Sequence, residues 1–422
     1  MSLPSLVVLY DKGAVHPVEV HVGLAQLAQP VFAVGDSEHA RRALAVIRRL
    51  GTPVVLGSRP DQDAKLLAEF RPAGIVTFSE DMVATTATLA EHLCLPYHSA
   101  ETTHLLRNKF AQRRRLCEAG VDATRSLLIR STGDYESAAR QVPFPAILKP
   151  ALGGASRDTH VVSGDLGSTD LVATLLARHA GAGLVLEELL VGRDVAAGIG
   201  DYVSVETAVV HGRVHHLALT GKFPLADPFR EVGQFWPALL DEREAAEILQ
   251  LVTDGIEALG VQLGITHTEI KLTPNGPRII EINGRMGGHI NELAVRSGVG
   301  NFVEIAGRLA MGECPPLPRA NPARVYWQYN TPSPRVTARL LANAHADRVM
   351  ATPGVTRYTP YYQSSDVLDT GVMTNPLDVI AGESQTHEAM LGQIDRLLDE
   401  VVYRLSFDDS EKNVTARELV AL

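Results

Sequence analysis

The sequence predicts a multidomain protein of mixed α/β and α+β class that begins with a Rossmann-like domain. Its 422 residues suffice for about two to four domains of ~100–200 residues each. Short apolar runs alternate with helical segments up to about residue 105, and strand-rich sequence with glycine turns follows up to about 312. The proline-rich segment CPPLPRANP at 314–322 then separates a smaller, last α/β unit. We therefore expect domain boundaries close to residues 107 and 313.

The composition indicates a soluble, folded protein and disfavours some classes of binding partner. Acidic residues (49) outnumber lysine and arginine (39), and the formal charge of −10 disfavours non-specific binding to nucleic acid or to anionic membranes. Cys94, Cys117 and Cys314 form no C-x-x-C pair, which suits a reducing cytoplasm. The N-terminus lacks the basic and apolar regions of a signal peptide, and no stretch approaches the ~18–20 apolar residues of a membrane span. We expect a cytoplasmic protein without nucleic-acid or membrane partners.

The first domain is predicted from apolar runs that alternate with helical segments such as HARRALAVIRRLG. This alternation favours a parallel, doubly wound sheet. No G-x-G-x-x-G motif follows the first run, so the dinucleotide-binding fingerprint is missing and the fold alone indicates no function. The four runs are residues 5–10, 30–35, 53–57 and 74–78.

Two further segments are predicted to be helical. Residues 105–121, LLRNKFAQRRRLCEAGV, predict an amphipathic helix that ends at Gly120. Because no aromatic residues are interleaved with its arginines, we interpret them as a solvated face and not as a nucleic-acid patch. The tail after residue 323 predicts strands at 325–329 and 355–362 and a helix near 385–404. The apolar stripe of that helix is interpreted as core packing or an oligomer surface, which leaves a homodimer open.

The segments ITHTEIKLTPNG and RIIEINGRMGGH predict a hairpin with one polar face. Alternate side chains of a strand share a face. A two-residue Asn-Gly turn would oppose Glu269 to Ile282 and mix the faces, whereas a three-residue Pro-Asn-Gly loop with Gly276 in the left-handed region opposes Glu269 to Glu281. We predict the second arrangement because it keeps each face uniform. The polar side chains are His267, Glu269 and Lys271 in the first strand, then Glu281, Asn283 and Arg285.

The opposed glutamates predict a metal site. Two facing carboxylates repel each other unless a cation lies between them, and with Asn283 they form an all-oxygen donor set that suits Mg²⁺. A solvated face with the glutamates paired to Lys271 or Arg285 is the alternative, which the second glutamate in matching register makes less favourable. His267 shares this face and either approaches a substrate or makes a structural hydrogen bond. Gly287 and Gly288 leave room for a substrate and provide backbone donors at a helix start.

Two segments upstream carry weaker signals. Residues 144–162 place Lys149 at the end of a strand before the small residues of loop 153–156, whose backbone N–H groups suit phosphate oxygens. An ordinary hairpin turn is the alternative, and no Walker A motif occurs. Residues 182–199 carry Glu187-Glu188 at a strand end and Asp194 beyond a glycine turn, which suits an adenine edge and a ribose but also an ordinary strand, turn and strand.

Taken in their order along the chain, these segments resemble the ATP-grasp superfamily. The resemblance is close over about 105–312 and looser for the flanking parts. It implies a pre-ATP-grasp domain at 1–107, a two-part central domain and an accessory domain at 314–422. The central domain would consist of a lid subdomain at 108–186 and a catalytic, metal-binding subdomain at 187–313.

The resemblance also implies a role for each matching residue. Lys109 and Lys149 match lysines that contact ATP phosphates, and loop 153–156 matches the glycine-rich loop that closes over the γ-phosphate. Arg285 matches the arginine that faces the transferred phosphoryl group and the acyl intermediate. The implied metal ligands, for Mg²⁺ with Mn²⁺ as a substitute, are Glu269, Glu281 and Asn283. The implied nucleotide contacts are Lys109, Lys149, Gly153, Gly154, Ser156, Glu187, Glu188, Leu190, Asp194 and Lys222.

The segment LTGKFPLADPFREVGQFWPALL resembles one branch of this superfamily, the carboxylate–amine ligases called L-amino acid ligases. In that branch an E-x-G-H segment helps to hold the amino group of the substrate; Glu231 and Gly233 match it, but Gln234 replaces the histidine. Ala155 in place of a loop glycine and Asp194 in place of a glutamate are milder departures.

The resemblance implies an ATP-dependent ligase that joins an amino acid carboxylate to an amine through an acyl phosphate and releases ADP and phosphate. Its catalytic residues would be Arg285, Lys149, Glu231 and His267. The amine would be free or bound to a carrier protein. Two alternatives stay open, namely a carboxylase subunit that uses bicarbonate and a nucleotide-binding regulatory protein without catalysis.

Overall fold

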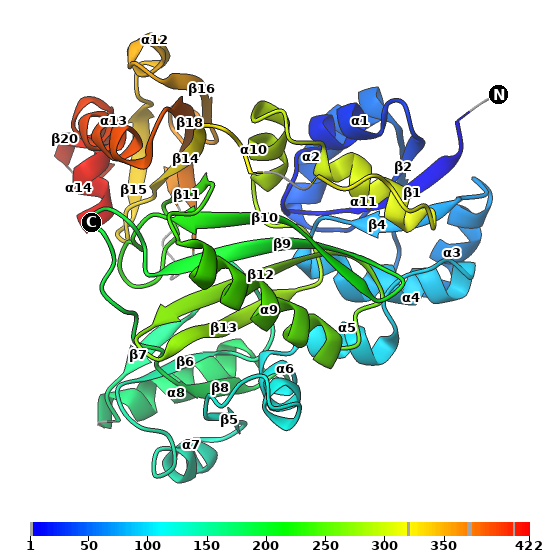
Figure 1. Ribbon diagram of the computed structural model, residues 1–422, viewed down its shortest axis with the longest axis horizontal. Helices are drawn as coiled ribbons and strands as arrows, with labels where there is room; N and C mark the ends of the chain where they lie inside the picture. The colour runs from blue at the N-terminus through cyan, green and yellow to red at the C-terminus, as the bar shows by residue number, and fades with distance from the viewer. Residues whose placement is uncertain (1–2, 165, 319–320, 369–373, 408–409) are drawn as a thin grey trace.

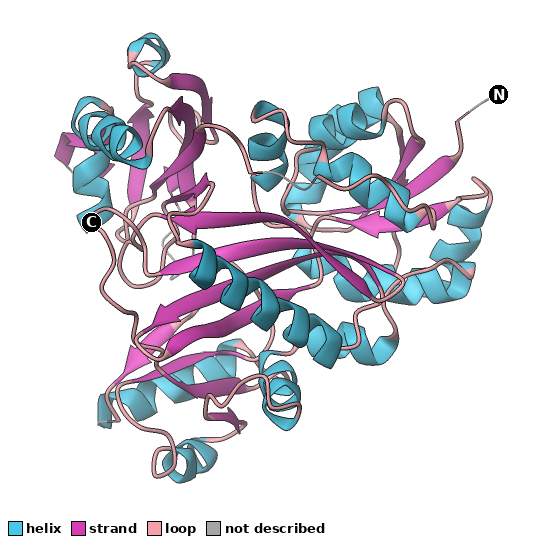
Figure 2. Ribbon diagram, viewed as in Figure 1, coloured by secondary structure: helices cyan, strands magenta, loops and turns pink. Residues whose placement is uncertain are grey.

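The computed structural model describes residues 3–164, 166–318, 321–368, 374–407 and 410–422, and the following account refers to these ranges (Figures 1 and 2). Their strands form one eight-stranded sheet and three four-stranded sheets. None of the helices in these ranges combines the length and the apolar composition that crossing a bilayer requires.

The N-terminal part is a doubly wound parallel sheet of order β3-β2-β1-β4, which confirms the Rossmann-like prediction. The strand order reverses between β1 and β4, and the loops after these strands are joined there. Ala14 N donates to Phe78 O (2.8 Å), and Ser79 Oγ donates to Lys12 O (2.7 Å). Such a switch point is where α/β sheets bind ligands. The elements are β1 (Ser5–Tyr10), α1 (Pro17–Leu24), β2 (Gln29–Val34), α2 (Glu38–Leu50), β3 (Thr52–Val55), α3 (Pro60–Ala68), β4 (Gly74–Thr77), the 3₁₀ helix η1 (Glu80–Met82) and α4 (Val83–Leu93).

The helix predicted at 105–121 is divided in two. α5 (Ala100–Arg107) ends at Asn108, which has extended backbone angles and begins α6 (Lys109–Glu118). The Asn108 side chain accepts a hydrogen bond from Ala111 N (2.9 Å), as an N-cap residue does. The break therefore places Lys109 in the first turn of a new helix.

The part predicted to be a lid subdomain contains an antiparallel sheet of order β5-β8-β6-β7, here called the lid sheet. Because β8 carries both Glu187 and Glu188, the lid sheet extends two residues beyond the predicted boundary at 186. The apolar side chains of Leu148, Val172 and Leu186 are buried in its core. The elements are β5 (Ser126–Ile129), α7 (Thr132–Ala138), β6 (Ala146–Pro150), β7 (His160–Val162), α8 (Leu166–Arg178) and β8 (Leu184–Glu188).

The large sheet has the order β13-β12-β9-β10-β11-β14-β18-β16 and includes strands from both sides of residue 314. The central and C-terminal parts of the chain are therefore continuous through one sheet. Its elements are β9 (Tyr202–Val210), β10 (Arg213–Lys222), β11 (Gly233–Trp236), α9 (Glu242–Ala258), β12 (Leu263–Thr273), β13 (Gly276–Asn283), α10 (Ile290–Arg296), α11 (Phe302–Ala310), β14 (Val325–Pro332), β16 (Val355–Pro360) and β18 (Pro376–Ser384).

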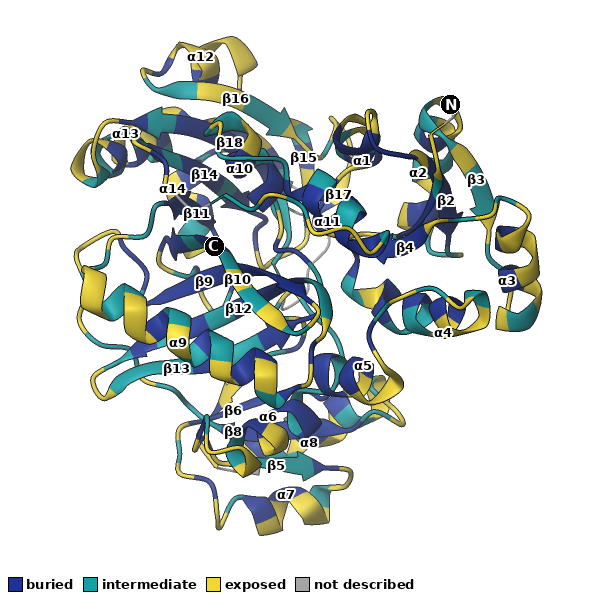
Figure 3. Cartoon of the chain, turned by 45° about the vertical axis from the view of Figure 1, so that its right-hand side comes forward, coloured by how far each residue is buried: buried dark blue, intermediate teal, exposed yellow. Residues whose placement is uncertain are grey.

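The two faces of this sheet differ in chemistry, as the alternation of side chains predicts. On one face Val205, Ile270 and Ile279 are buried with Val252 and Ile256 of α9 in one apolar cluster. Figure 3 shows α9 with exposed residues on its outer side and buried strands beneath it. The other face carries the polar residues of the predicted site.

The C-terminal part completes the large sheet and adds a sheet of order β17-β15-β19-β20. The helix predicted near 385–404 ends at Glu400, and the β-branched pair Val401-Val402 leads into β19 instead. Met390, Ile394 and Leu397 of its apolar stripe lie in the core, which supports the core-packing interpretation. The remaining elements are β15 (Ala338–Ala342), α12 (Ala346–Ala351), β17 (Val367–Leu368), α13 (His387–Glu400), β19 (Val402–Phe407), β20 (Ser410–Thr415) and α14 (Ala416–Ala421).

Candidate active site

Glu269 and Glu281 face each other directly across the β12–β13 hairpin, as predicted. The turn that achieves this was predicted wrongly. Thr273 pairs with Gly276, so the turn contains two residues and not three, and a β-bulge between Glu269 and Ile270 then shifts the register by one residue. The bulge restores a uniform polar face.

Two side chains of α6 form hydrogen bonds with backbone groups of β13, which is the edge strand of the large sheet. Gln112 exchanges two hydrogen bonds of 2.8 Å with the N–H and the carbonyl of Ile282, as a neighbouring strand would. Arg113 donates to Ile279 O (2.6 Å) and Ile280 O (2.8 Å) at the bulge. Both side chains are buried, so the interpretation of this helix face as solvated is wrong at these positions. Buried backbone carbonyls need donors, and α6 provides them here.

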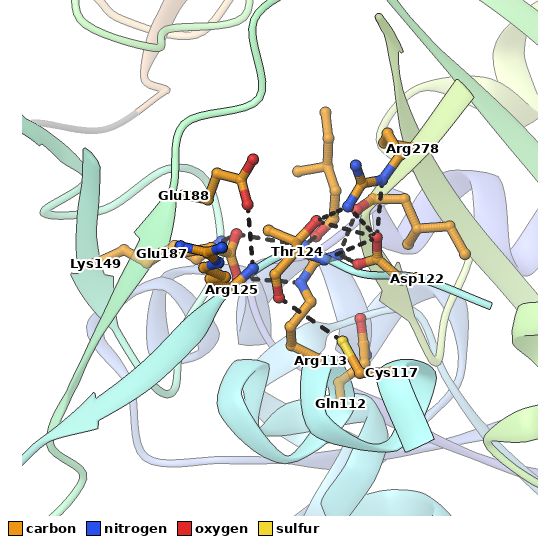
Figure 4. A network of polar contacts seen from close by, with 12 residues as sticks. Gln112, Arg113, Cys117, Asp122, Thr124, Arg125, Lys149, Glu187, Glu188 and Arg278 are labelled. Atoms are coloured by element: carbon orange, nitrogen blue, oxygen red, sulfur yellow. Dashed lines mark hydrogen bonds and ion pairs between the residues drawn. The ribbon is translucent and has the colours of Figure 1, made fainter. Parts of the chain in front are cut away.

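Arg113 is also the centre of a buried charge network that reaches Lys149 (Figure 4). Its guanidinium pairs with Asp122 and with Glu187 (Nε–Oε2 3.1 Å), and Lys149 Nζ lies 3.0 Å from Glu187 Oε1. Burial alone would raise the pKa of Glu187, but the charges of Arg113 and Lys149 outweigh it and lower the pKa to about 2. The Glu187 carboxylate is thus engaged by two cations within the protein.

Each of the opposed glutamates has a cationic neighbour. Lys109 forms an ion pair with Glu281, and His267 Nε2 lies 3.5 Å from Glu269 Oε1. Burial alone lowers the pKa of His267, but the adjacent Glu206 carboxylate raises it to about 9, so the ring is protonated at neutral pH. Burial would raise the pKa of Glu269, yet His267 holds it near 2. The Glu269 carboxylate is therefore charged, and Glu281 is engaged in an ion pair with Lys109.

These residues fit the donor set that a magnesium ion requires. Asn283 lies two residues beyond Glu281 and pairs with His267, which puts its amide on the same face. The amide is buried, and within the described ranges its side chain has no hydrogen-bond partner. Two carboxylates and one uncommitted amide oxygen are hard ligands of the kind that Mg²⁺ binds.

Arg285 lies against a carboxylate of the N-terminal domain. Its Nε is 3.2 Å from Oε2 of Glu80, which begins η1 directly after β4, and its Nη1 donates to Met286 O (3.2 Å). Burial raises the pKa of Glu80, and the Arg285 charge opposes that rise. Sequence reasoning missed Glu80. The available signal was its place at the carboxyl end of a strand beside the switch point.

The two glycines after Arg285 have different roles. A Cβ on Gly287 would lie 2.4 Å from His267 Nδ1 and 2.6 Å from Glu206 Oε1, so only glycine fits there. Its N–H donates to Glu206 Oε2 (3.0 Å). Gly287 is therefore needed for close packing. A Cβ on Gly288 would have no atom within 4 Å, so of the two glycines only Gly288 leaves the space that was predicted for a substrate.

The segment around Glu231 joins the same polar face through Lys222. Lys222 Nζ lies 3.6 Å from Glu231 Oε2 and donates to Oε1 of Gln234 (3.3 Å), its register partner on β11. Gln234 Nε2 donates to Gly288 O (2.8 Å) and Gln328 Oε1 (3.1 Å). The glutamine that replaces the expected histidine thus has all its polar atoms engaged by neighbours.

The remaining predicted nucleotide contacts lie in two loops. Loop 153–156 follows β6, and a Cβ on Gly154 would lie 3.7 Å from Cγ of Glu80, so this loop approaches the Arg285 side of the site. Leu190 is half-buried and Asp194 exposed in the loop after β8. That loop ends at Asp201, which pairs with Lys271 (2.7 Å) and was not predicted.

The chain was compared with protein-family models and with curated proteins. No protein-family model matches the chain. It is 28% identical over 243 residues to alanine–anticapsin ligase of Bacillus subtilis (strain 168), which covers 54% of this chain and 51% of that protein. It is 27% identical over 303 residues to carnosine synthase 1 of Gallus gallus, which covers 68% of this chain and 30% of that one. The chain thus spans about half, or less, of the length of these curated relatives.

Solved structures superpose on almost the whole length of this chain. The L-amino acid ligase from Bacillus licheniformis superposes with a TM-score of 0.75 at 20% identity and covers 94% of this chain and 98% of its own. N5-carboxyaminoimidazole ribonucleotide synthetase from Thermus thermophilus gives 0.70 at 16% identity, with coverage of 94% and 98%. The chain has the ATP-grasp fold. Within it, the chain resembles the branch of the L-amino acid ligases.

The ATP-grasp architecture explains how the two halves of the site meet. The lid sheet contributes Lys149 and Glu187, and the polar face of the large sheet contributes Glu269 and Glu281. α6 joins the halves, because Arg113 contacts Glu187 in the lid and the backbone of β13 at the same time.

Proposed function

We propose that this ATP-grasp protein is an ATP-dependent ligase that joins the carboxylate of an amino acid to an amine through an acyl phosphate, with ADP and phosphate as products. The observation that carries the proposal is the opposed pair Glu269–Glu281 beside Asn283, with Arg285 two residues further along. A protein that only binds a nucleotide has no need for two metal ligands and an arginine placed for an acyl intermediate. The two curated relatives named above are a ligase and a synthase by name.

Glu269, Glu281 and Asn283 would hold Mg²⁺, or Mn²⁺ in its place. The ion supplies neutralisation of the β- and γ-phosphate oxygens during transfer. Solved structures with this fold support the use of ATP, since one is described as an ADP complex and another as complexed with ATP.

Three lysines surround the proposed phosphate position. Lys109 lies at the start of α6 against Glu281, Lys149 extends from the lid, and Lys222 is buried on β10. Each contacts a carboxylate or an amide in this structure, and phosphate oxygens would take over part of these contacts. Backbone N–H groups of loop 153–156, with the Ser156 hydroxyl, add neutral donors.

Arg285 would stabilise the negative charge that develops in each of the two steps of the reaction. A carboxylate is a poor acyl donor, so its oxygen first attacks the γ-phosphorus atom, and an amine then attacks the acyl carbon of the resulting acyl phosphate. The first transition state bears charge on the phosphoryl oxygens, and the second forms a tetrahedral oxyanion. Glu80 orients the guanidinium for both from the opposite side. Glu231 is proposed to bind the amino group of a substrate. His267 is proposed to hold Glu269 in place on the face that would bind the metal.

The reaction is tested by measuring ADP and phosphate release for a matrix of amino acid pairs, with mass detection of the product. We expect stoichiometric amide and ADP for at least one pair, with the amine either free or on a carrier protein. AMP and pyrophosphate as products would refute the proposal. ADP release that depends on bicarbonate alone would instead favour a carboxylase, a class to which several fold neighbours belong by name. ATP binding without turnover on any substrate would favour the regulatory alternative.

We propose a cytoplasmic setting for the protein. The three cysteines are free thiols, which fits a reducing cytoplasm. A homodimer remains a proposal, and the apolar stripe of α13 does not support it because Met390, Ile394 and Leu397 are in the core.

A further inference from the structure

Thr374 connects two parts of the candidate site that are far apart in sequence. Its backbone N–H donates to Ala155 O in the glycine-rich loop (2.9 Å), and its hydroxyl Oγ1 accepts from Glu231 N (3.1 Å). The loop belongs to the nucleotide side of the site, and Glu231 lies beside Lys222 on the substrate side. A single half-buried residue of the C-terminal part thus contacts both.

The loop has a conformation that its surroundings must maintain. Ala155 (φ 58°) and Ser156 (φ 54°) both adopt left-handed backbone angles, which cost free energy for residues other than glycine. At the far end the loop is anchored, because Asp158 accepts from Arg178 Nη1 (2.5 Å) and lies 2.7 Å from His179 Nε2. At the tip, Ala155 O accepts the hydrogen bond from Thr374 N (2.9 Å).

Asn375, the residue after Thr374, makes two hydrogen bonds to other parts of the chain. Asn375 Nδ2 donates to the hydroxyl of Tyr362 (2.7 Å), and Asn375 O accepts from Ser333 N (3.0 Å). On the substrate side, Arg230 Nη1 donates to Ser333 O (2.6 Å), so Glu231 is anchored to the same structure. Thr374 is therefore next to a hydrogen-bonded part of the chain that also holds the Glu231 segment.

We propose that Thr374 is a positioning residue that holds loop 153–156 closed when the Glu231 segment is in its substrate-bound place. The inference rests on the proposed function. With the loop closed, water is excluded from the acyl phosphate. With the loop loose, water attacks the acyl carbon, the bond from that carbon to the phosphate oxygen breaks, phosphate leaves, and the attacking water loses its protons to give back the carboxylate. ATP is then consumed without amide formation.

The partition between amide and hydrolysis tests this role. In Thr374→Val the side chain keeps its shape but loses the acceptor for Glu231 N, whereas Thr374→Ser keeps that acceptor. One hydrogen bond of ~1 kcal/mol corresponds to about a fivefold effect, so we expect the amide formed per ADP released to fall about fivefold in Thr374→Val and to return close to the wild-type value in Thr374→Ser. Thr88→Val on exposed α4 is the matched control and should leave the ratio unchanged.

Equal ratios for a folded Thr374→Val and the wild type would overturn the inference, as would a Thr374→Ser variant as defective as Thr374→Val. A second measurement needs no variant. Arg157 is exposed in the same loop, so trypsin cleavage after it reports loop opening. A non-hydrolysable ATP analogue with an amino acid should protect Arg157 more than the analogue alone, and protection independent of the amino acid would also overturn the inference. Failure of the wild type to form any amide would instead refute the proposed function.

Discussion

Arg285 on the strand-to-helix loop and Glu80 on the N-terminal domain form an ion pair, with Nε 3.2 Å from Oε2. The pair joins the carboxyl end of β4 to the loop that follows the β12–β13 hairpin. Both side chains are largely buried, so the contact is weakly screened by solvent. The orientation of Arg285 therefore depends on a domain that carries none of the predicted phosphate contacts.

Replacing Glu80 by glutamine should lower kcat and leave the KM for ATP nearly unchanged. The amide keeps the shape and the hydrogen-bonding capacity but removes the charge that orients Arg285, and we expect about a tenfold loss of kcat. Steady-state ADP release measures it. Asp81→Asn changes the next, exposed residue in the same way and is the control. A Glu80→Gln enzyme with wild-type kcat would show that Arg285 is oriented without this pair.

Glu281→Gln and Arg285→Ala should each abolish turnover while the protein stays folded. The first removes one of two opposed carboxylates of the proposed metal site, and the second removes the positive charge next to the transferred group. Losses of this kind typically reach about 10²-fold or more. ADP release and thermal melting of the purified variants test both statements together. Substantial activity in both variants would refute the assignment of the site.

Removal of the Arg113 side chain should strongly destabilise the protein. Arg113→Met leaves Glu187 and Asp122 buried without their shared cation, a change that typically costs about 3–5 kcal/mol. Arg114→Met on the exposed face of the same helix should change the free energy of unfolding by less than about 0.5 kcal/mol. Urea titrations of the two variants give the comparison, and similar stabilities would contradict the central role of Arg113.

The stability of the protein should respond to pH through Asp378 in the C-terminal part. Burial raises the pKa of this carboxyl to about 6; Tyr403 donates to its Oδ2 (2.5 Å), and Oδ1 has no hydrogen-bond partner within the described ranges. Because the folded state binds the proton more tightly than the unfolded state, this group reduces stability as the pH rises from about 4 to 6.

Asp378→Asn should remove that pH dependence and raise the free energy of unfolding at pH 8, by at most about 3 kcal/mol. Chemical denaturation at pH 4 and at pH 8 provides the test. The variant and the wild type should differ little at pH 4, where the carboxyl is largely protonated in the folded state. A difference of equal size at the two pH values would show that ionisation is not the cause.

Local patterns were sufficient for much of the fold and for the main site residues. Period-two alternation predicted the polar face of the β12–β13 hairpin and the pairing of Glu269 with Glu281, and alternating strands and helices predicted the N-terminal sheet. These features depend on neighbouring residues and on turn chemistry, which a single segment contains. The predictions for the lysines and for loop 153–156 depended on the order of these segments along the chain.

Features that depend on distant contacts were missed or predicted wrongly. The turn before Gly276 is shorter than predicted because a bulge, stabilised by Arg113, corrects the register. The helix that begins at His387 ends at Glu400 because the following residues pair with β15 and β20 in another sheet. In both cases, burial of unsatisfied backbone groups outweighed the local preference.

The sequence by itself therefore determined which side chains share a face, where the strands of the N-terminal domain lie and that Glu269 opposes Glu281, because these follow from periodicity. The tertiary structure alone decided that Glu80 orients Arg285, that Arg113 joins the lid to the hairpin and that Thr374 bridges loop 153–156 and Glu231. Each of these contacts joins segments more than 70 residues apart, and each is set by burial of charge and of backbone polar groups when the sheets come together.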